Sequence, residues 1–282
     1  MLTGRFNFRC YAAVIALILG VFSGVGCSSD IAVGSGRLGE GAPDPGSEGS
    51  TDPRNQSQNT GNAIKFAGAL EPGIISAHDQ GGLVFNFETV LVAIDEVMIR
   101  LPKDVSCDDL ETGTTATQYC HRNAVYLSGT VVADLVNGSQ ISNFPLPRGR
   151  YHRAKAHIGP ASWNDIPHDS PVRDLTVYGA GTFEVGGELK QFKLRQRIGK
   201  SVGFFTRTGI ELASGENLVL LMNVDRWLKD LNIAPCLADG RLTPEDGVIV
   251  LGTGCGTATL LKNAIKQSTD IAVEADGKIF PL

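Results

Sequence analysis

The chain has 282 residues, 42% of them hydrophobic, and its 25 basic and 30 acidic side chains give a net charge of −5. Residues 1–27 contain two arginines and no acidic residue, so residues 28–282 carry a net charge of −7. Proteins that bind nucleic acid need a basic footprint. The charge balance therefore argues against that class, and we expect no nucleic-acid partner.

Residues 1–27 have the pattern of an export signal. Arg5 and Arg9 precede an apolar core of 12 residues, Tyr11 to Phe22, and small residues follow before Cys27. A membrane span needs about 20 apolar residues, so this core is too short to be one and is typical of a signal peptide.

The junction before Cys27 resembles the lipobox of bacterial lipoproteins, in which the cysteine is diacylated and becomes the first residue of the mature chain. The chain departs from that pattern at Gly24, where the family usually has an aliphatic residue. The resemblance implies lipidation at Cys27 and anchoring to a membrane of the bacterial cell envelope, namely the outer membrane, on its periplasmic or surface face. An ordinary secretory signal and an uncleaved anchor remain the alternatives.

Residues 28–62 are dominated by Gly, Ser, Pro, Asp, Asn and Gln. Such a segment has too little apolar surface to offset the entropy lost on ordering, so we expect a disordered tether. Residues 63–282 are long enough to bury a core and are expected to form the folded domain.

Four cysteines remain in that domain, and four thiols allow three disulfide pairings. The local pairing joins Cys107 with Cys120 and Cys236 with Cys255, and each bond would stabilise the domain by about 3 kcal/mol. A zinc site built from all four thiolates is the competing reading, but it normally needs closely spaced cysteine pairs. We expect no metal and no cofactor.

The domain has the pattern of a β-rich protein. In the run 83–101 the sets Val90/Val92/Ile94 and Val97/Ile99/Leu101 alternate with period two, and a bulge at Asp95–Glu96 would reset the faces. Gly186–Gly187 predicts a two-residue hairpin turn. The ranges expected to form strands are 64–70, 83–101, 124–136, 141–146, 150–158, 175–178, 181–194, 202–206, 209–213, 217–224 and 270–273.

Two short helical segments are expected near the C-terminus, a turn over 225–231 with Trp227 at the end of the core, and a helix over 257–267. Many short strands with Gly-rich turns predict a mainly β fold, an antiparallel β-sandwich or an open barrel.

Two motifs add a resemblance: Asp134-Leu-Val-Asn-Gly138 and Leu146-Pro-Arg-Gly-Arg-Tyr151. Together with the runs that follow up to Leu228, they resemble a domain family of bacterial lipoproteins that is known only as of unknown function. The resemblance implies a transthyretin-like sandwich in the cell envelope and no activity.

The sequence has no H-E-x-x-H and no P-loop, and its five histidines are scattered. Acidic clusters at Asp108-Asp109-Glu111 and at Glu274/Asp276 could offer oxygen ligands to calcium, but they lack the ligand spacing of a dedicated loop. We expect a non-catalytic protein.

One basic strand stands out. With Ala154, Ala156 and Ile158 facing inward, period two predicts an outward face of Tyr151, Arg153, Lys155 and His157, next to Arg150. A second basic run holds Lys190, Lys193, Arg195, Arg197 and Lys200. If the two runs were neighbours they would form an anion- or acidic-glycan-binding patch. The alternative is a solvated face whose charges discourage edge aggregation.

Three hypotheses follow for the function. The first is a lipid-anchored β-sandwich that binds a ligand or a surface partner, such as an acidic glycan or an envelope protein. The second is a structural or assembly subunit of an envelope complex. The third is a hydrolase whose catalytic groups come from distant strands, since fold alone does not give function.

Overall fold

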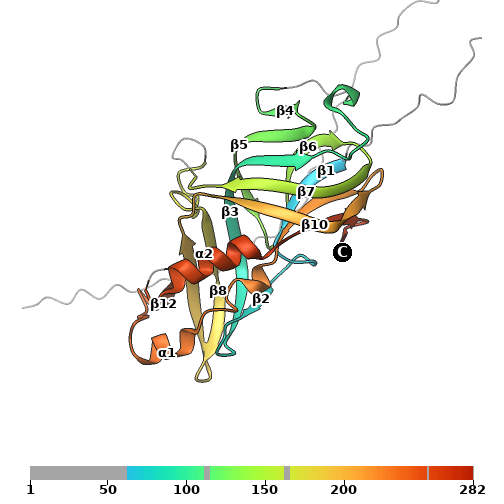
Figure 1. Ribbon diagram of the computed structural model, residues 1–282. Helices are drawn as coiled ribbons and strands as arrows, with labels where there is room; N and C mark the ends of the chain where they lie inside the picture. Colours follow the sequence, from blue (N-terminus) through green and yellow to red (C-terminus); the bar gives the residue numbers. More distant parts are fainter. Residues whose placement is uncertain (1–61, 111–114, 162–165, 253, 282) are drawn as a thin grey trace, which may run out of the picture. The chain divides into compact units, whose positions relative to one another are not determined.

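The computed structural model describes residues 62–110, 115–161, 166–252 and 254–281, which all lie in one compact unit. The described chain is mainly β, with two sheets and two short α-helices (Figure 1). This confirms the predicted β-sandwich with a few helical segments near the C-terminus.

The larger sheet is built around β3, a strand of 17 residues (Val84–Arg100). Its other members are β2 (Ile75–His78), β4 (Gln118–His121), β5 (Ala124–Asp134), β7 (Gly149–Ile158), β8 (Val177–Val185), β9 (Glu188–Gln196), β10 (Lys200–Leu212) and β12 (Val248–Leu251).

Different strands pair with the two ends of β3. Residues 94–99 of β3 pair with β7 and residues 85–92 pair with β8, while β5 and β2 occupy the opposite edge. Because Ile94 pairs with both β5 and β7, and Val92 with both β5 and β8, β7 and β8 follow each other along one edge of β3. We call the two parts of the sheet the β7 half and the β8 half.

The smaller sheet has the strand order β14-β13-β11-β1-β6. Its members are β1 (Asn62–Ala67), β6 (Ser139–Leu146), β11 (Asn217–Met222), β13 (Thr269–Ala275) and β14 (Lys278–Phe280). β11 is buried on both faces, as its near-continuous apolar sequence predicted. β1 begins at Asn62, one residue before the predicted start of the domain.

The smaller sheet covers the inner face of the β7 half. Phe66 of β1 meets Phe204 of β10 edge to face, with ring centroids 5.7 Å apart. Ile64, Leu220 and Ile271 from the smaller sheet share one apolar cluster with residues of β3 and β7. Burial of apolar surface between two sheets is what holds a sandwich together.

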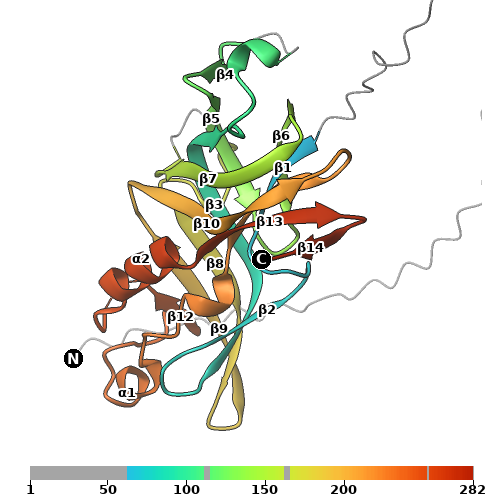
Figure 2. The same ribbon diagram turned by 45° about the vertical axis from the view of Figure 1, so that its right-hand side comes forward.

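The β8 half is covered by helical segments. These segments are η2 (Val224–Arg226), α1 (Ile233–Ala238) and α2 (Thr257–Gln267). A further short helical segment, η1 (Cys107–Asp109), lies outside this half. Figure 2 shows α1 and α2 beside β8, β9 and β12. Phe192 contacts the rings of Phe85, Phe87 and Phe183, at centroid distances of 5.2, 4.9 and 6.3 Å.

Several sequence predictions are confirmed. The register of β3 shifts between Ile94 and Glu96, where the bulge was expected. Gly186 and Gly187 form the β8–β9 turn with φ of 62° and 78°, α2 has the predicted bounds, and Trp227 is fully buried.

Other predictions were wrong in detail. The two runs 202–206 and 209–213 form one strand, β10, whose register shifts between Phe205 and Ile210. The runs 175–178 and 181–194 divide differently, because β8 continues unbroken from Val177 to Val185. The prediction also missed β2, β4, β12, β14 and α1, all of six residues or fewer.

Both predicted disulfides are present, Cys107–Cys120 and Cys236–Cys255. All four cysteines of the domain are therefore oxidised, which overturns the zinc-thiolate alternative. The first bond ties η1 to the edge strand β4 and the second ties α1 to the segment before α2.

Candidate functional site

The predicted basic strand is β7, and three of its predicted side chains lie together. Ala154, Ala156 and Ile158 are buried, while Arg153, Lys155 and His157 are exposed on the opposite face. Side chains at i and i+2 of a strand lie about 6.7 Å apart on one face, so these three groups form a row.

Tyr151 is not part of this row, which corrects the prediction. Tyr151 is 1% exposed, and its hydroxyl donates a hydrogen bond to the carbonyl oxygen of Pro147 at 2.7 Å. The alternation of β7 breaks because Arg153 pairs with Phe205 of β10 while Tyr151 pairs with Ile210, so β10 has extra residues at this point. Burial raises the pKa of Tyr151, and its ring belongs to the core.

Arg150 lies beyond the same break and has a partner of its own. Its Nε is 3.2 Å from Oε2 of Glu211, the residue opposite it on β10. Both side chains are mostly exposed, so the pair contributes little to stability, but it leaves Arg150 outside the row.

Cross-strand pairing adds residues that sequence reasoning missed. Lys155 pairs with Met98 of β3, Met98 with Tyr126 of β5, and Tyr126 with Tyr119 of β4. Directly paired residues point to the same face of a sheet. The two tyrosine rings stack, with centroids 5.1 Å apart and planes 6° apart.

Arg100 extends the positive charge sideways. Because Ile99 pairs with Ala154, the next position brings the exposed Arg100 opposite Arg153. On the other side of Arg153 lies Phe205, whose side chain is 60% exposed. We call Arg100, Arg153, Lys155 and His157 the basic face.

Three of these four cations have no acidic partner among the described residues. Within the described residues, no carboxylate lies within ion-pair distance of Arg100, Arg153 or Lys155. His157 differs, because its Nδ1 is 3.2 Å from Oδ2 of Asp95 and Glu96 is its cross-strand neighbour. Like charges placed directly opposite each other destabilise a sheet, so an anionic ligand would relieve the repulsion between Arg100 and Arg153.

Of the second basic run, Lys200 belongs to β10 and lies opposite Ile158 of β7, but the cations of β9 do not lie beside the first run. Lys190, Lys193 and Arg195 belong to β9, which pairs with β8 and β12 and not with β7. The outer face of the larger sheet is the face that carries Arg153 and Lys155. Over its middle, Ala161, Ile166 and Val172 form a small apolar cluster with Ala93 of β3. The single compact patch that would have followed from neighbouring strands is therefore not formed.

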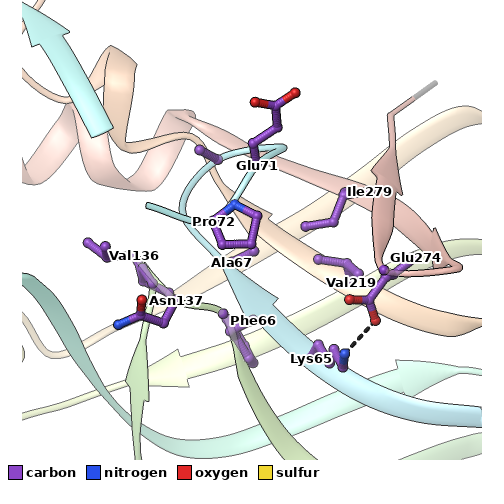
Figure 3. A pocket seen from close by; sticks show the side chains of 14 residues that line it. Lys65, Phe66, Ala67, Glu71, Pro72, Val136, Asn137, Val219, Glu274 and Ile279 are labelled. Carbon is purple, nitrogen blue, oxygen red and sulfur yellow. Dashed lines mark ion pairs between the residues drawn. The ribbon is translucent and has the colours of Figure 1, made fainter. Parts of the chain in front are cut away.

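A small cavity lies on the outer side of the smaller sheet (Figure 3), with a volume of about 50 Å³. In it, Nζ of Lys65 is 2.5 Å from Oε2 of Glu274, which also accepts a hydrogen bond of 2.7 Å from Asn217. Burial opposes the charge on Glu274, but the hydrogen bonds from Lys65 and Asn217 outweigh it and lower its pKa. The cavity has room for a few water molecules only, and its Lys65 and Glu274 are paired with each other.

In the other acidic cluster, Asp109 is held by local hydrogen bonds. Asp109 accepts hydrogen bonds from the backbone N–H and the hydroxyl of Ser106, which lower its pKa. Glu111 lies outside the described residues. Among the residues that the structure describes, no three His, Cys, Asp or Glu side chains gather as a metal site would require.

The known proteins offer no guide to this surface, since no protein-family model, curated protein or solved structure matches the chain. In the described part of the chain, no helix is long and apolar enough to cross a membrane. Cys27 and the tether lie outside the described residues, apart from Asn62.

Proposed function

We propose that this chain is an exported, lipid-anchored protein of the bacterial cell envelope whose β-sandwich binds an anionic glycan, without catalysis, on the basic face. The observation that carries the proposal is the group formed by Arg100, Arg153 and Lys155, exposed cations that have no carboxylate partner among the described residues, in a chain of net charge −5. Anchoring through Cys27 rests on the lipobox resemblance of the sequence.

The surroundings of the cations suit a sugar ligand. Phe205 is 60% exposed beside Arg153 and provides an apolar ring, while Met98 and the stacked Tyr119 and Tyr126 continue the row from Lys155. Charged side chains that bind carboxylate or sulfate groups, next to apolar surface for the faces of sugar rings, would give both affinity and orientation.

Thermal unfolding of the chain from residue 28 onward, with polygalacturonate, neutral dextran or inorganic phosphate added, tests the binding. The apolar core of the described residues lies within 62–281, so this protein retains that core. A ligand at about a hundred times its Kd stabilises by about 2.7 kcal/mol, which raises Tm by roughly 5–10 °C for a domain of this size.

We expect the shift with polygalacturonate to disappear in Arg153→Ala/Lys155→Ala and to persist in the control Lys229→Ala/Lys266→Ala, whose lysines are exposed elsewhere. An undiminished shift in the first variant would contradict the proposal.

Lipidation is tested separately by fractionation: Cys27→Ser should move the full-length protein from the membrane pellet to the soluble fraction.

A further inference from the structure

The second basic run is aligned with the basic face along one line of the sheet. β9 ends at Gln196 and β10 begins at Lys200, and one alternation runs through both. The buried positions are Phe192, Leu194, Gln196, Ile198, Val202 and Phe204, so the odd-numbered residues between them face outward. Lys200 is the exception, being exposed at an even-numbered position.

Hydrogen bonds hold the short gap between β9 and β10 in line. The backbone N–H of Thr176 donates to the carbonyl oxygen of Gln196 at 2.9 Å, and its hydroxyl accepts from the N–H of Ile198 at 2.8 Å. Thr176 is fully buried and uncharged. The outward side chains of β9 and β10 therefore share one face.

That line carries cations at one end and small residues in its middle. Its outward positions are Lys193, Arg195, Arg197, Gly199, Ser201, Gly203 and Phe205, with no acidic residue among them. A Cβ atom added at Gly199 or Gly203 would meet no atom within 4 Å. Gly203 lies beside Lys155 and Phe205 beside Arg153, so the line ends on the basic face.

The β9 end of the line contains a hollow. Arg195 and Arg197 line a space of about 440 Å³ together with residues of β12 and the start of α2. Glu245 is the one carboxylate among its described lining residues. No described carboxylate lies within ion-pair distance of Arg195 or Arg197.

We infer that these two groups of cations bind one extended ligand, a linear acidic polysaccharide that runs along β9 and β10 from Arg195 and Arg197 to Lys155 and Arg153. The inference rests on the proposed function and specifies its ligand. Arg197 and Gly203 are six residues apart, or about 20 Å at the rise of a β-strand. A short anionic sugar can contact one group of cations, and only a longer chain can contact both.

The net charge of the chain favours a polysaccharide over nucleic acid. A duplex carries about one charge per 1.7 Å, and such a dense polyanion would be repelled by the acidic remainder of a protein of net charge −5. An acidic polysaccharide is less densely charged, and small residues at Gly199, Ser201 and Gly203 leave room for its rings to approach the backbone.

Calorimetric titration tests the inference with two oligogalacturonates, one about 10 Å long and the other about 40 Å long. The distance between the two groups of cations, about 20 Å, lies between these lengths. Once the long oligomer is bound to one group of cations, it can contact the second group within the same complex. The long oligomer should therefore bind at least about tenfold more tightly than the short one. Arg195→Ala/Arg197→Ala should remove this advantage and leave the Kd of the short oligomer unchanged.

Gly203→Glu, which places a carboxylate beside Lys155 at the β10 end of the line, should weaken both oligomers. Gly199→Glu, which lies nearer the centre, should weaken the long oligomer alone. Lys229→Ala/Lys266→Ala is the charge-matched control and should bind both oligomers as the parent protein does.

The outcomes separate the two proposals. Equal affinity for the two lengths, or no effect of Arg195→Ala/Arg197→Ala on the long one, overturns the extended site and leaves the basic face intact. Failure of both oligomers to bind overturns the proposed function as well. Tighter binding of single-stranded DNA of matched charge than of the long oligomer would overturn the assignment to a polysaccharide.

Discussion

The two halves of the large sheet share one strand, β3, but bury it differently. The β7 half packs against a second sheet and leaves its outer face bare and cationic, whereas the β8 half packs against helical segments around a cluster of phenylalanines. The inner faces of both halves contribute buried side chains to one apolar cluster. The proposed binding lies on the outer face of the β7 half, and its line of outward cations continues along β9 into the β8 half.

The largest expected effect is at Gly181 in the β8 half. A Cβ atom there would lie 1.9 Å from the carbonyl oxygen of Asn86 on β3, next to the register shift between Phe87 and Thr89. Gly181→Ala should therefore lower the unfolding free energy by more than about 4 kcal/mol, because the backbone of β3 at Asn86 must move.

Gly203 of the β7 half is the matched control, since it also lies in a strand but faces open space. Gly203→Ala should leave the unfolding free energy unchanged or raise it by up to about 1 kcal/mol, because alanine loses less conformational freedom than glycine. Urea denaturation measures both variants, and equal losses in the two would contradict the contrast.

The phenylalanine cluster gives the next effect. Phe192 is 1% exposed and contacts three other rings, so Phe192→Ala should lower the unfolding free energy by about 3–4 kcal/mol through a buried cavity. Phe205→Ala, on the exposed face of the β7 half, should change it by less than about 0.5 kcal/mol. Guanidinium denaturation followed by tryptophan fluorescence compares the two.

Acid should act through the sheet that covers the β7 half. The folded-state pKa of Glu274 is lowered, so its contribution is complete above the unfolded-state pKa of about 4.3 and is lost as pH falls through the lower folded-state pKa. Glu274→Gln should cost roughly 1 kcal/mol at neutral pH and should flatten the decline of Tm between about pH 5 and pH 3. A parallel decline in both proteins would show that Glu274 has no part in it.

The smallest effect concerns repulsion on the basic face. Arg100 and Arg153 are opposite each other without a described counter-ion, so Arg100→Ser should stabilise the unliganded protein by about 0.2–1 kcal/mol at low ionic strength. The gain should vanish in about 1 M salt, where the Debye length is about 3 Å. A gain that is independent of salt would assign the effect to packing or propensity and not to charge.

Sequence patterns predicted the individual strands and helices better than they predicted which strands pair with each other. The bulge after Ile94, the Gly186–Gly187 turn and the bounds of α2 depend on local residues, and each was found where the local pattern indicated it. Strands such as β4 and β12, of four residues each, are too short to show a period.

The candidate site was predicted only in part, for a physical reason. Arg153, Lys155 and His157 follow from alternation within β7, whereas Tyr151 turns inward because of extra residues in β10, some 55 positions away along the chain. Arg100, Phe205 and the tyrosine pair join the site through cross-strand register, which a single sequence does not specify.

The pairing of β1 has a consequence for the order of folding. β1 is the first strand of the described residues, yet it lies parallel to β11, with Ile64 opposite Leu218 and Ala63 hydrogen-bonded to Asn217 across 154 positions. Such non-local pairing folds slowly, because a long loop must close before any contact rewards it. The smaller sheet cannot close until most of the chain has left the ribosome, so a chain threaded through a membrane during its synthesis would enter it while this sheet is still unformed.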